Sequence, residues 1–187
     1  VMAAFLEAAN AHPAVRAGCA GAIGYCFGGQ CVLEQVRAGH ELQAVVSFHG
    51  LLQSYPLKDP LKPGERLSHE EFVKEVDIAP NSYNRACKVL IENGDLDEEV
   101  PQAAYDAWRK EMDEQSIDWV FHNHARTPHG FALAPGVWAT AYHENADRRS
   151  TLAMLELFAE VWPEHPQLPV VTNACGTLLR PYVTAKL

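Results

Sequence analysis

The chain has 187 residues, of which 48 % are hydrophobic and 21 % charged, so a disordered, collagen-like or low-complexity protein is excluded and one domain of ordinary size is expected. With 15 Lys and Arg residues against 24 Asp and Glu residues, the net charge is −9, and we expect neither nucleic acid nor an anionic membrane as a partner. No apolar stretch approaches the ~18 residues that a membrane-spanning helix needs.

The five cysteines are scattered along the sequence, and no two of them form a CxxC pair. The first 13 residues lack the basic start and the long apolar stretch of a secretory signal. Both features predict free thiols in a reducing compartment, and we therefore expect a cytoplasmic protein.

Segments typical of helices and of buried strands follow one another along the chain. Helical patterns occupy residues 2–11, 30–38, 101–114 and 145–161, with a further short helix expected at 68–76. Short apolar runs typical of strands occupy residues 19–25, 43–48, 88–91 and 117–122. A long polar connection at 51–86 and an acidic loop at 92–100 join some of these segments.

Short strands with nearly continuous apolar runs are typical of a sheet that is buried on both faces. The sequence therefore predicts a three-layer α/β fold, with a mainly parallel sheet and helices on both of its faces. We expect one domain at residues 1–163 and a proline-containing C-terminal extension at 164–187. In such sheets, functional sites form beyond the C-terminal ends of the strands.

The first candidate site residue is Cys26, in the sequence GYCFGG (24–29) between an expected strand and an expected helix. This is the G-x-S-x-G pattern of a nucleophile elbow, with cysteine in place of serine. Side chains at Gly24 and Gly28 are expected to collide with neighbouring backbone in so sharp a turn. The N–H groups and partial positive charge at the helix start would favour a Cys26 thiolate. A tight turn that merely holds a buried cysteine is the alternative.

Two further loops follow later strands, and each holds a residue that could complete a catalytic triad. GDLDEEVP (94–101) offers Asp97 or its close rival Asp95 as the acid that orients a histidine. TPHGF (127–131) offers His129 as the base, and Gly130 gives the backbone the freedom to present it. Cysteine, then aspartate, then histidine is the nucleophile–acid–base order of α/β-hydrolases.

Together, GYCFGG, GDLDEEVP and HGF resemble the dienelactone hydrolase (carboxymethylenebutenolidase-like) family of the α/β-hydrolase fold, over roughly residues 2–161. The resemblance implies that Cys26 is the nucleophile, Asp97 the triad acid and His129 the base. It also implies that the backbone N–H of Phe27 is one oxyanion donor.

These roles predict a hydrolase that cleaves a small ester or lactone through a thioacyl-enzyme intermediate. The chemistry needs no metal and no organic cofactor. The expected partner is a small-molecule ester or lactone, and the sequence leaves open whether the chain is a monomer or a homo-oligomer.

The sequence departs from the family pattern in two places. Family members carry several strands before the elbow, whereas only the helix expected at 2–11 precedes it here. The missing part would supply those strands, the second oxyanion donor and the glutamate that faces the resting cysteine in family members. The sequence leaves open whether the chain is a fragment with these parts upstream or a diverged form without them. Bacterial dienelactone hydrolases also place an arginine four residues after the triad histidine, where this chain has Leu133, which favours a less charged ester than dienelactone itself.

Histidines outside the expected triad allow other interpretations. His122 and His124 alternate on an expected strand and point to one side of it, but their spacing is not typical of a zinc site, and we expect no metal. His49, at the end of an expected strand, either lines the pocket or caps the strand.

The alternative function is a non-catalytic binding or scaffold module, derived from a truncated α/β-hydrolase. Alkylation discriminates between the two, because a thiol in a working triad should react faster than Cys31 or Cys87.

Overall fold

The computed structural model describes residues 2–54, 82–137, 141–164, 171–172 and 178–179. The short helix expected at 68–76, much of the expected connection at 51–86 and most of the expected extension at 164–187 lie outside the described residues. The elements are α1 (Met2–Ala11), β1 (Gly21–Tyr25), α2 (Phe27–Arg37), β2 (Ala44–Phe48), β3 (Lys88–Gly94), α4 (Gln102–Glu114), β4 (Asp118–His124), α5 (Glu144–Val161), β5 (Val171–Thr172) and β6 (Leu178–Leu179).

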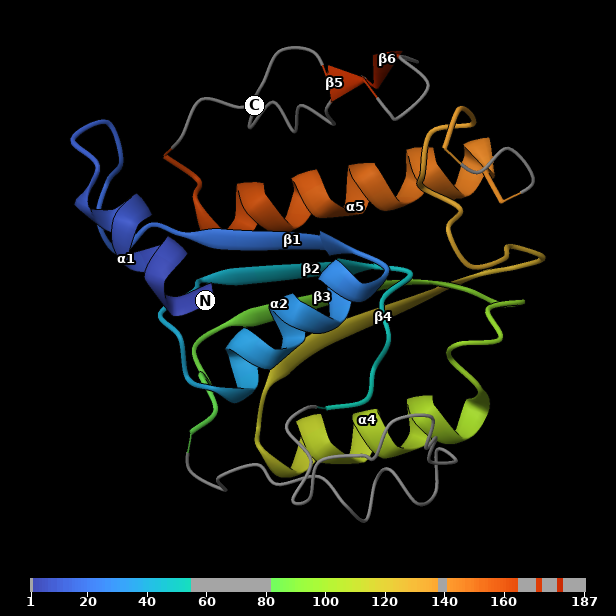
Figure 1. Cartoon of the computed structure of the whole chain (residues 1–187), viewed down its shortest axis with the longest axis horizontal. Coiled ribbons are helices and arrows are strands. Elements are labelled where there is room, and N and C mark those ends of the chain that lie inside the picture. The colour runs from blue at the N-terminus through green and yellow to red at the C-terminus, as the bar shows by residue number, and fades with distance from the viewer. Residues whose placement is uncertain (1, 55–81, 138–140, 165–170, 173–177, 180–187) are drawn as a thin grey trace, which may run out of the picture.

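Strands β1 to β4 form one sheet in the order β1-β2-β3-β4, and every neighbouring pair is parallel. All five residues of β2 are buried, which agrees with a strand covered on both faces. In Figure 1 the strands run in one direction, so the loops that follow them gather at one end of the sheet. The predicted parallel α/β fold is confirmed.

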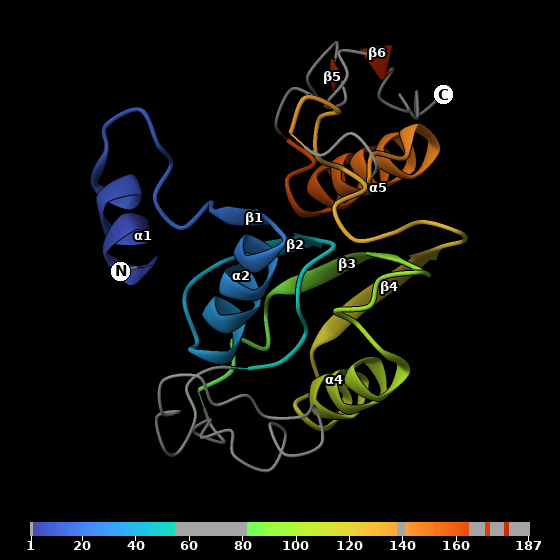
Figure 2. The same cartoon turned by 45° about the vertical axis from the view of Figure 1, so that its right-hand side comes forward.

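Helices cover both faces of the sheet, as the sequence predicts. Helix α5 lies on one face, and α2 and α4 lie on the other (Figures 1 and 2). The larger core cluster includes Leu33 and Val36 of α2 and Trp108 and Met112 of α4. A smaller cluster, which includes Val46, Phe48, Leu90 and Phe131, packs against half-buried residues of α5. None of the described helices combines the length and hydrophobicity needed to cross a bilayer.

Two strands run further than the sequence predicts, and the acidic loop expected at 92–100 begins later. Strand β3 continues to Gly94, so Glu92 is a strand residue with no exposed surface rather than a loop residue. Strand β4 continues to His124. A buried carboxylate is rare unless it is paired, and Glu92 is paired with histidines of β4. Because these partners are distant in sequence, the local pattern at 92–94 contains no sign of them and predicts a loop.

The β1 side of the sheet is less covered than its centre. Within the described residues β1 pairs with β2 alone, and Ile23 and Tyr25 are 47 % and 38 % exposed. Helix α1 has no buried residue and contributes only the half-buried Leu6 to the larger core. The sheet as described therefore ends at the strand that carries the elbow.

A buried ion pair joins α2 to α4 beneath the sheet. Arg37, whose side chain is 2 % exposed, donates to both carboxylate oxygens of Glu111, at 2.7 and 2.8 Å. The same guanidinium donates to Glu34 at 2.7 Å and to the carbonyl of Leu52 at 2.8 Å. Arg37 thus fixes both helices against the segment that leaves β2.

Replacing Arg37 with methionine should lower the free energy of unfolding by about 3 kcal/mol, because it leaves Glu111 without its guanidinium partner. Lys110→Met is the control, since Lys110 lies on the outer side of α4 with its side chain 76 % exposed. Urea denaturation followed by circular dichroism measures both variants. Equal losses in the two variants would contradict a specific role for the buried pair.

Candidate active site

The elbow places Cys26 on a strained turn between β1 and α2. Cys26 has φ +53° and ψ −123°, and its N–H donates to the carbonyl of Phe48 at 3.1 Å. Positive φ is uncommon for residues other than glycine, and strain of this kind gathers at functional sites. The turn therefore holds the Cys26 side chain at the start of α2, beside the end of β2.

The glycines of the elbow are needed at Gly24 and Gly29. A Cβ on Gly24 would lie 2.1 Å from the carbonyl oxygen of Gly28, and one on Gly29 would lie 2.7 Å from the Cα of Gly50. The expected collision at Gly28 is wrong, because a Cβ there meets no atom within 4 Å. Position 24 requires glycine because the backbone of Gly28 lies too close to leave room for a Cβ there.

Asp97, rather than Asp95, faces the candidate base. Its carboxylate has no exposed surface; Oδ1 accepts from the N–H of Glu99 at 2.9 Å, and Oδ2 lies 2.8 Å from Nδ1 of His129. The exposed Asp95 accepts instead from the side-chain amide of Asn123 at 3.2 Å. The structure thus separates two aspartates that the sequence leaves as rivals.

His129 joins the other two candidate residues. Its Nε2 lies 3.1 Å from Sγ of Cys26, while its Nδ1 faces Asp97. An ionised carboxylate can only accept, so Nδ1 carries a proton. Gly130 follows with φ +79°, which agrees with the freedom expected there. Three residues from three separate loops therefore form one continuous hydrogen-bonded arrangement.

Backbone hydrogen bonds hold the two loops that carry the acid and the base. The N–H of Leu96 donates to the carbonyl of Thr127 at 3.0 Å, and the N–H of Asp95 donates to that of His124 at 2.9 Å. Phe131, two residues after His129, has no exposed surface and lies in the core beneath α5. These contacts fix the loops relative to the sheet and so fix the distance between acid and base.

The electrostatics of the arrangement favour a protonated base. Hydrogen bonding to Asp97 chiefly, and to Cys26 as well, raises the pKa of His129 to about 9, although burial opposes the shift. At neutral pH the His129 imidazole is then positively charged, and a positive group beside a cysteine favours its thiolate. The geometry can therefore activate Cys26 as a nucleophile.

Phe27 is the first residue of α2, directly after Cys26. The first N–H groups of an α-helix have no acceptor within the helix and carry partial positive charge. Phe27 is 64 % exposed and directly follows the turn that carries the Cys26 sulfur. This is the position at which the resemblance to dienelactone hydrolases implies an oxyanion donor.

Sequence reasoning missed the partner of two histidines. His122 Nδ1 and His124 Nε2 lie 2.8 and 2.6 Å from the two carboxylate oxygens of the fully buried Glu92. The two histidines do share one side of β4, as predicted, and this hydrogen bonding raises the pKa of His122. Their alternation is the signal available in the sequence, but the carboxylate between them belongs to a stretch whose local pattern predicts a loop. Within the described residues, no group of three or more His, Cys, Asp or Glu side chains is arranged to hold a metal ion.

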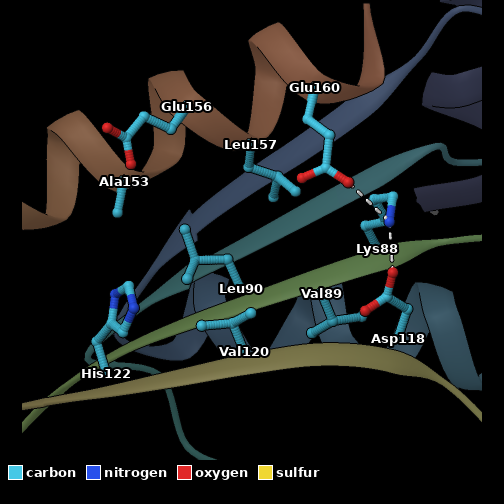
Figure 3. Close-up of a pocket in the computed structure, with 10 residues that line it drawn as sticks. All are labelled: Lys88, Val89, Leu90, Asp118, Val120, His122, Ala153, Glu156, Leu157 and Glu160. Carbon is cyan, nitrogen blue, oxygen red and sulfur yellow. Dashed lines mark hydrogen bonds and ion pairs between the residues drawn. The ribbon is translucent and has the colours of Figure 1, made fainter. Parts of the chain in front are cut away.

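A pocket of about 310 Å³ lies between α5 and strands β3 and β4 (Figure 3). At one end, Lys88 pairs with Asp118 and, at 2.9 Å, with Glu160, and His122 lies at the other end. Neither Cys26 nor His129 lines it. The pocket is therefore separate from the three-residue arrangement.

Comparison with known proteins gives consistent matches. The sequence profile of the dienelactone hydrolase family matches residues 2–162. An uncharacterized protein of Caenorhabditis elegans is 31 % identical over 166 residues, covering 85 % of this chain and 90 % of that protein.

Solved structures show the same likeness. A dienelactone hydrolase-like promiscuous phosphotriesterase from metagenomic libraries is 28 % identical with a TM-score of 0.62, covering 83 % of this chain and 58 % of that one. A protein named m3DLH is 31 % identical with a TM-score of 0.61, covering 86 % of this chain and 62 % of that one. An α/β hydrolase from a deep-sea metagenome, 16 % identical with a TM-score of 0.51 over 76 % of this chain and 54 % of that one, shares the fold. The chain thus spans about three fifths of the length of the first two solved relatives.

Asp97→Asn should move the pKa of His129 down toward its ordinary 6.5, because it removes the carboxylate that raises it most. Asp95→Asn is the matched control and should leave that pKa near 9, since Asp95 bonds to Asn123 instead. Nuclear magnetic resonance titration of the imidazole, assigned against His129→Gln, measures both. Equal shifts in the two variants would contradict the assignment of Asp97.

Proposed function

Because the chain belongs to the dienelactone hydrolase family, we propose that it hydrolyses a small ester or lactone through Cys26, His129 and Asp97. The observation that carries the proposal is the continuous arrangement in which His129 lies 3.1 Å from the Cys26 sulfur and 2.8 Å from Asp97. Nucleophile, base and orienting acid within hydrogen-bond reach are the geometric signature of covalent catalysis.

Acylation begins from a Cys26 thiolate beside a protonated His129. The thiolate attacks the substrate carbonyl carbon, and the oxygen that becomes negative is stabilised by the N–H of Phe27 at the start of α2. When the tetrahedral intermediate collapses, the bond to the leaving oxygen breaks and His129 gives that oxygen its proton. A thioester on Cys26 remains, and Asp97 holds the now neutral imidazole in place.

Hydrolysis of the thioester completes the cycle. Neutral His129 takes a proton from a water molecule, which attacks the thioester carbonyl. The bond to sulfur breaks, the acid product leaves, and the site returns to thiolate and imidazolium. Side chains and backbone of the protein supply every catalytic group in these reaction steps, so the proposal includes no cofactor.

The substrate proposed is a small and weakly charged ester or lactone. Leu133, half-buried after the base loop, stands where the resemblance to bacterial dienelactone hydrolases places a carboxylate-binding arginine. A leucine cannot pair with a substrate carboxylate, and the chain as a whole carries a charge of −9. Both features favour substrates without a negative charge.

An activated aryl ester should give a burst of about one aryl alcohol per chain, followed by slower turnover, since acyl-enzyme accumulation produces such a burst. Cys26→Ala should abolish it. Cys31→Ala is the matched control, because Cys31 is another half-buried free thiol of the chain and lies within α2. A burst that persists without Cys26 would contradict the proposal, and a folded protein with no burst would favour the scaffold alternative.

With an alkyl ester, kcat/KM should fall as the pH rises through about 9, because His129 then loses the proton that the leaving alkoxide requires. An activated aryl ester needs that proton less, so its kcat/KM should fall less over the same range. Parallel pH–rate profiles for the two esters test this difference. Profiles that stay flat to pH 10 for both would contradict the role of His129 as proton donor.

A further inference from the structure

His49 is a buried histidine that the proposed mechanism does not use. It follows β2 directly, has no exposed surface and adopts φ +39°. Its backbone N–H donates to the carbonyl of Glu92 at 2.8 Å, which ties the residue to β3. No other described residue provides either ring nitrogen with a hydrogen bond.

The ring of His49 packs against the base and its surroundings. Its centroid lies 5.1 Å from that of His129, with the rings inclined at 69°, and 5.3 Å from that of Phe131 at 76°. Tyr25, one residue before Cys26, lies 5.8 Å away on another side. His49 therefore touches the base, its loop and the strand that leads to the nucleophile.

His49 combines two energetically unfavourable features. A left-handed backbone is unfavourable for a side chain other than glycine, and a buried polar atom without a partner is destabilising. Such features persist where the surrounding structure requires them, and they gather at functional sites. In this chain they coincide at a residue that packs edge to face on His129.

We propose that His49 is a positioning residue whose ring holds the imidazole of His129 between Asp97 and Cys26. The ring occupies one side of His129, so that side cannot be taken by water and the base cannot swing toward β2. This inference rests on the proposed function, because positioning His129 matters only if His129 acts in catalysis. The packing of His49 on His129 does not depend on which substrate the chain takes.

The charge state of His49 is consistent with this role. Burial, together with the positive charge of His129, lowers the pKa of His49 to about 4, although Asp97 opposes the shift. The titratable groups that face it are His129, Asp97 and Tyr25. At neutral pH the positive charge therefore resides on His129, and His49 is an uncharged aromatic ring. A phenyl ring should then replace it, whereas a small side chain should not.

The test compares His49→Ala and His49→Phe with the wild type, His129→Ala and the control His40→Phe. His40 is half-buried and bonds to Gln35, away from the site. The first measurement is the alkylation rate of Cys26 by iodoacetamide at pH 6, followed by mass spectrometry of its peptide. This reports the thiolate that His129 maintains and requires no ester turnover.

We expect His49→Ala to slow alkylation about 10-fold, toward the rate of His129→Ala, because a misplaced base no longer favours the thiolate. His49→Phe and His40→Phe should stay within about 2-fold of the wild type. If the alanine variant does not fold, His49→Leu takes its place with the same expectation, since it fills the space without a flat ring.

The second measurement separates positioning from folding. With the aryl ester, a positioning role lowers the burst rate and leaves its amplitude at about one per chain. A purely structural role lowers the amplitude at an unchanged rate, and that result would overturn the inference. Wild-type alkylation in His49→Ala would overturn it too, as would a phenylalanine variant as slow as the alanine variant. If the wild type gives no burst but His49→Ala still slows alkylation, the proposed function fails and this inference stands.

Discussion

The parallel register of the sheet is the constraint on which the candidate site depends. Tyr25, Phe48, Glu92 and His122 are aligned across the four strands. Strands β1 and β2 end at this row, and β3 and β4 end two residues beyond it, at the same edge of the sheet. The residues that follow this row on β1 and β2 are Cys26 and His49. The loops after β3 and β4 then bring Asp97 and His129 back over the same edge. Residues more than 100 positions apart in the sequence meet because the strands share one direction and one register.

Backbone strain at the site is sustained by burial around it. Positive φ occurs at Cys26 and His49, directly after β1 and β2. Each of these residues is fixed by a hydrogen bond from its own N–H to the neighbouring strand. The side chains beneath them, Phe48 and Phe131, have no exposed surface. A local backbone conformation that costs a few kcal/mol can persist there because packing in the sheet core holds these residues in place.

The sequence was sufficient for the parts of the site that depend on local pattern. Glycines around Cys26 predict the elbow, and the order of Cys26, aspartate and His129 after successive strands predicts their meeting. Whether Asp95 or Asp97 faces the base could not be predicted, because both follow the same strand and only the path of the loop separates them. The extent of β3 could not be predicted either, since Glu92 is buried through partners on β4 that are 30 and 32 residues away. The expected clash at Gly28 was wrong because it is the carbonyl of this residue that approaches Gly24.

In the proposed mechanism, activation of the nucleophile and stabilisation of the oxyanion depend on different parts of the chain. Activation needs only Cys26, His129 and Asp97, which meet within the described residues. The proposed stabilisation of the oxyanion relies on N–H groups at the start of α2, on the side of the sheet where, within the described residues, β1 pairs with β2 alone. Loss of one oxyanion donor costs about 10²–10³ in rate without changing the reactivity of the thiol. A reactive Cys26 and a fast hydrolase are therefore separable properties of this fold. Alkylation reports the first, and ester turnover reports both.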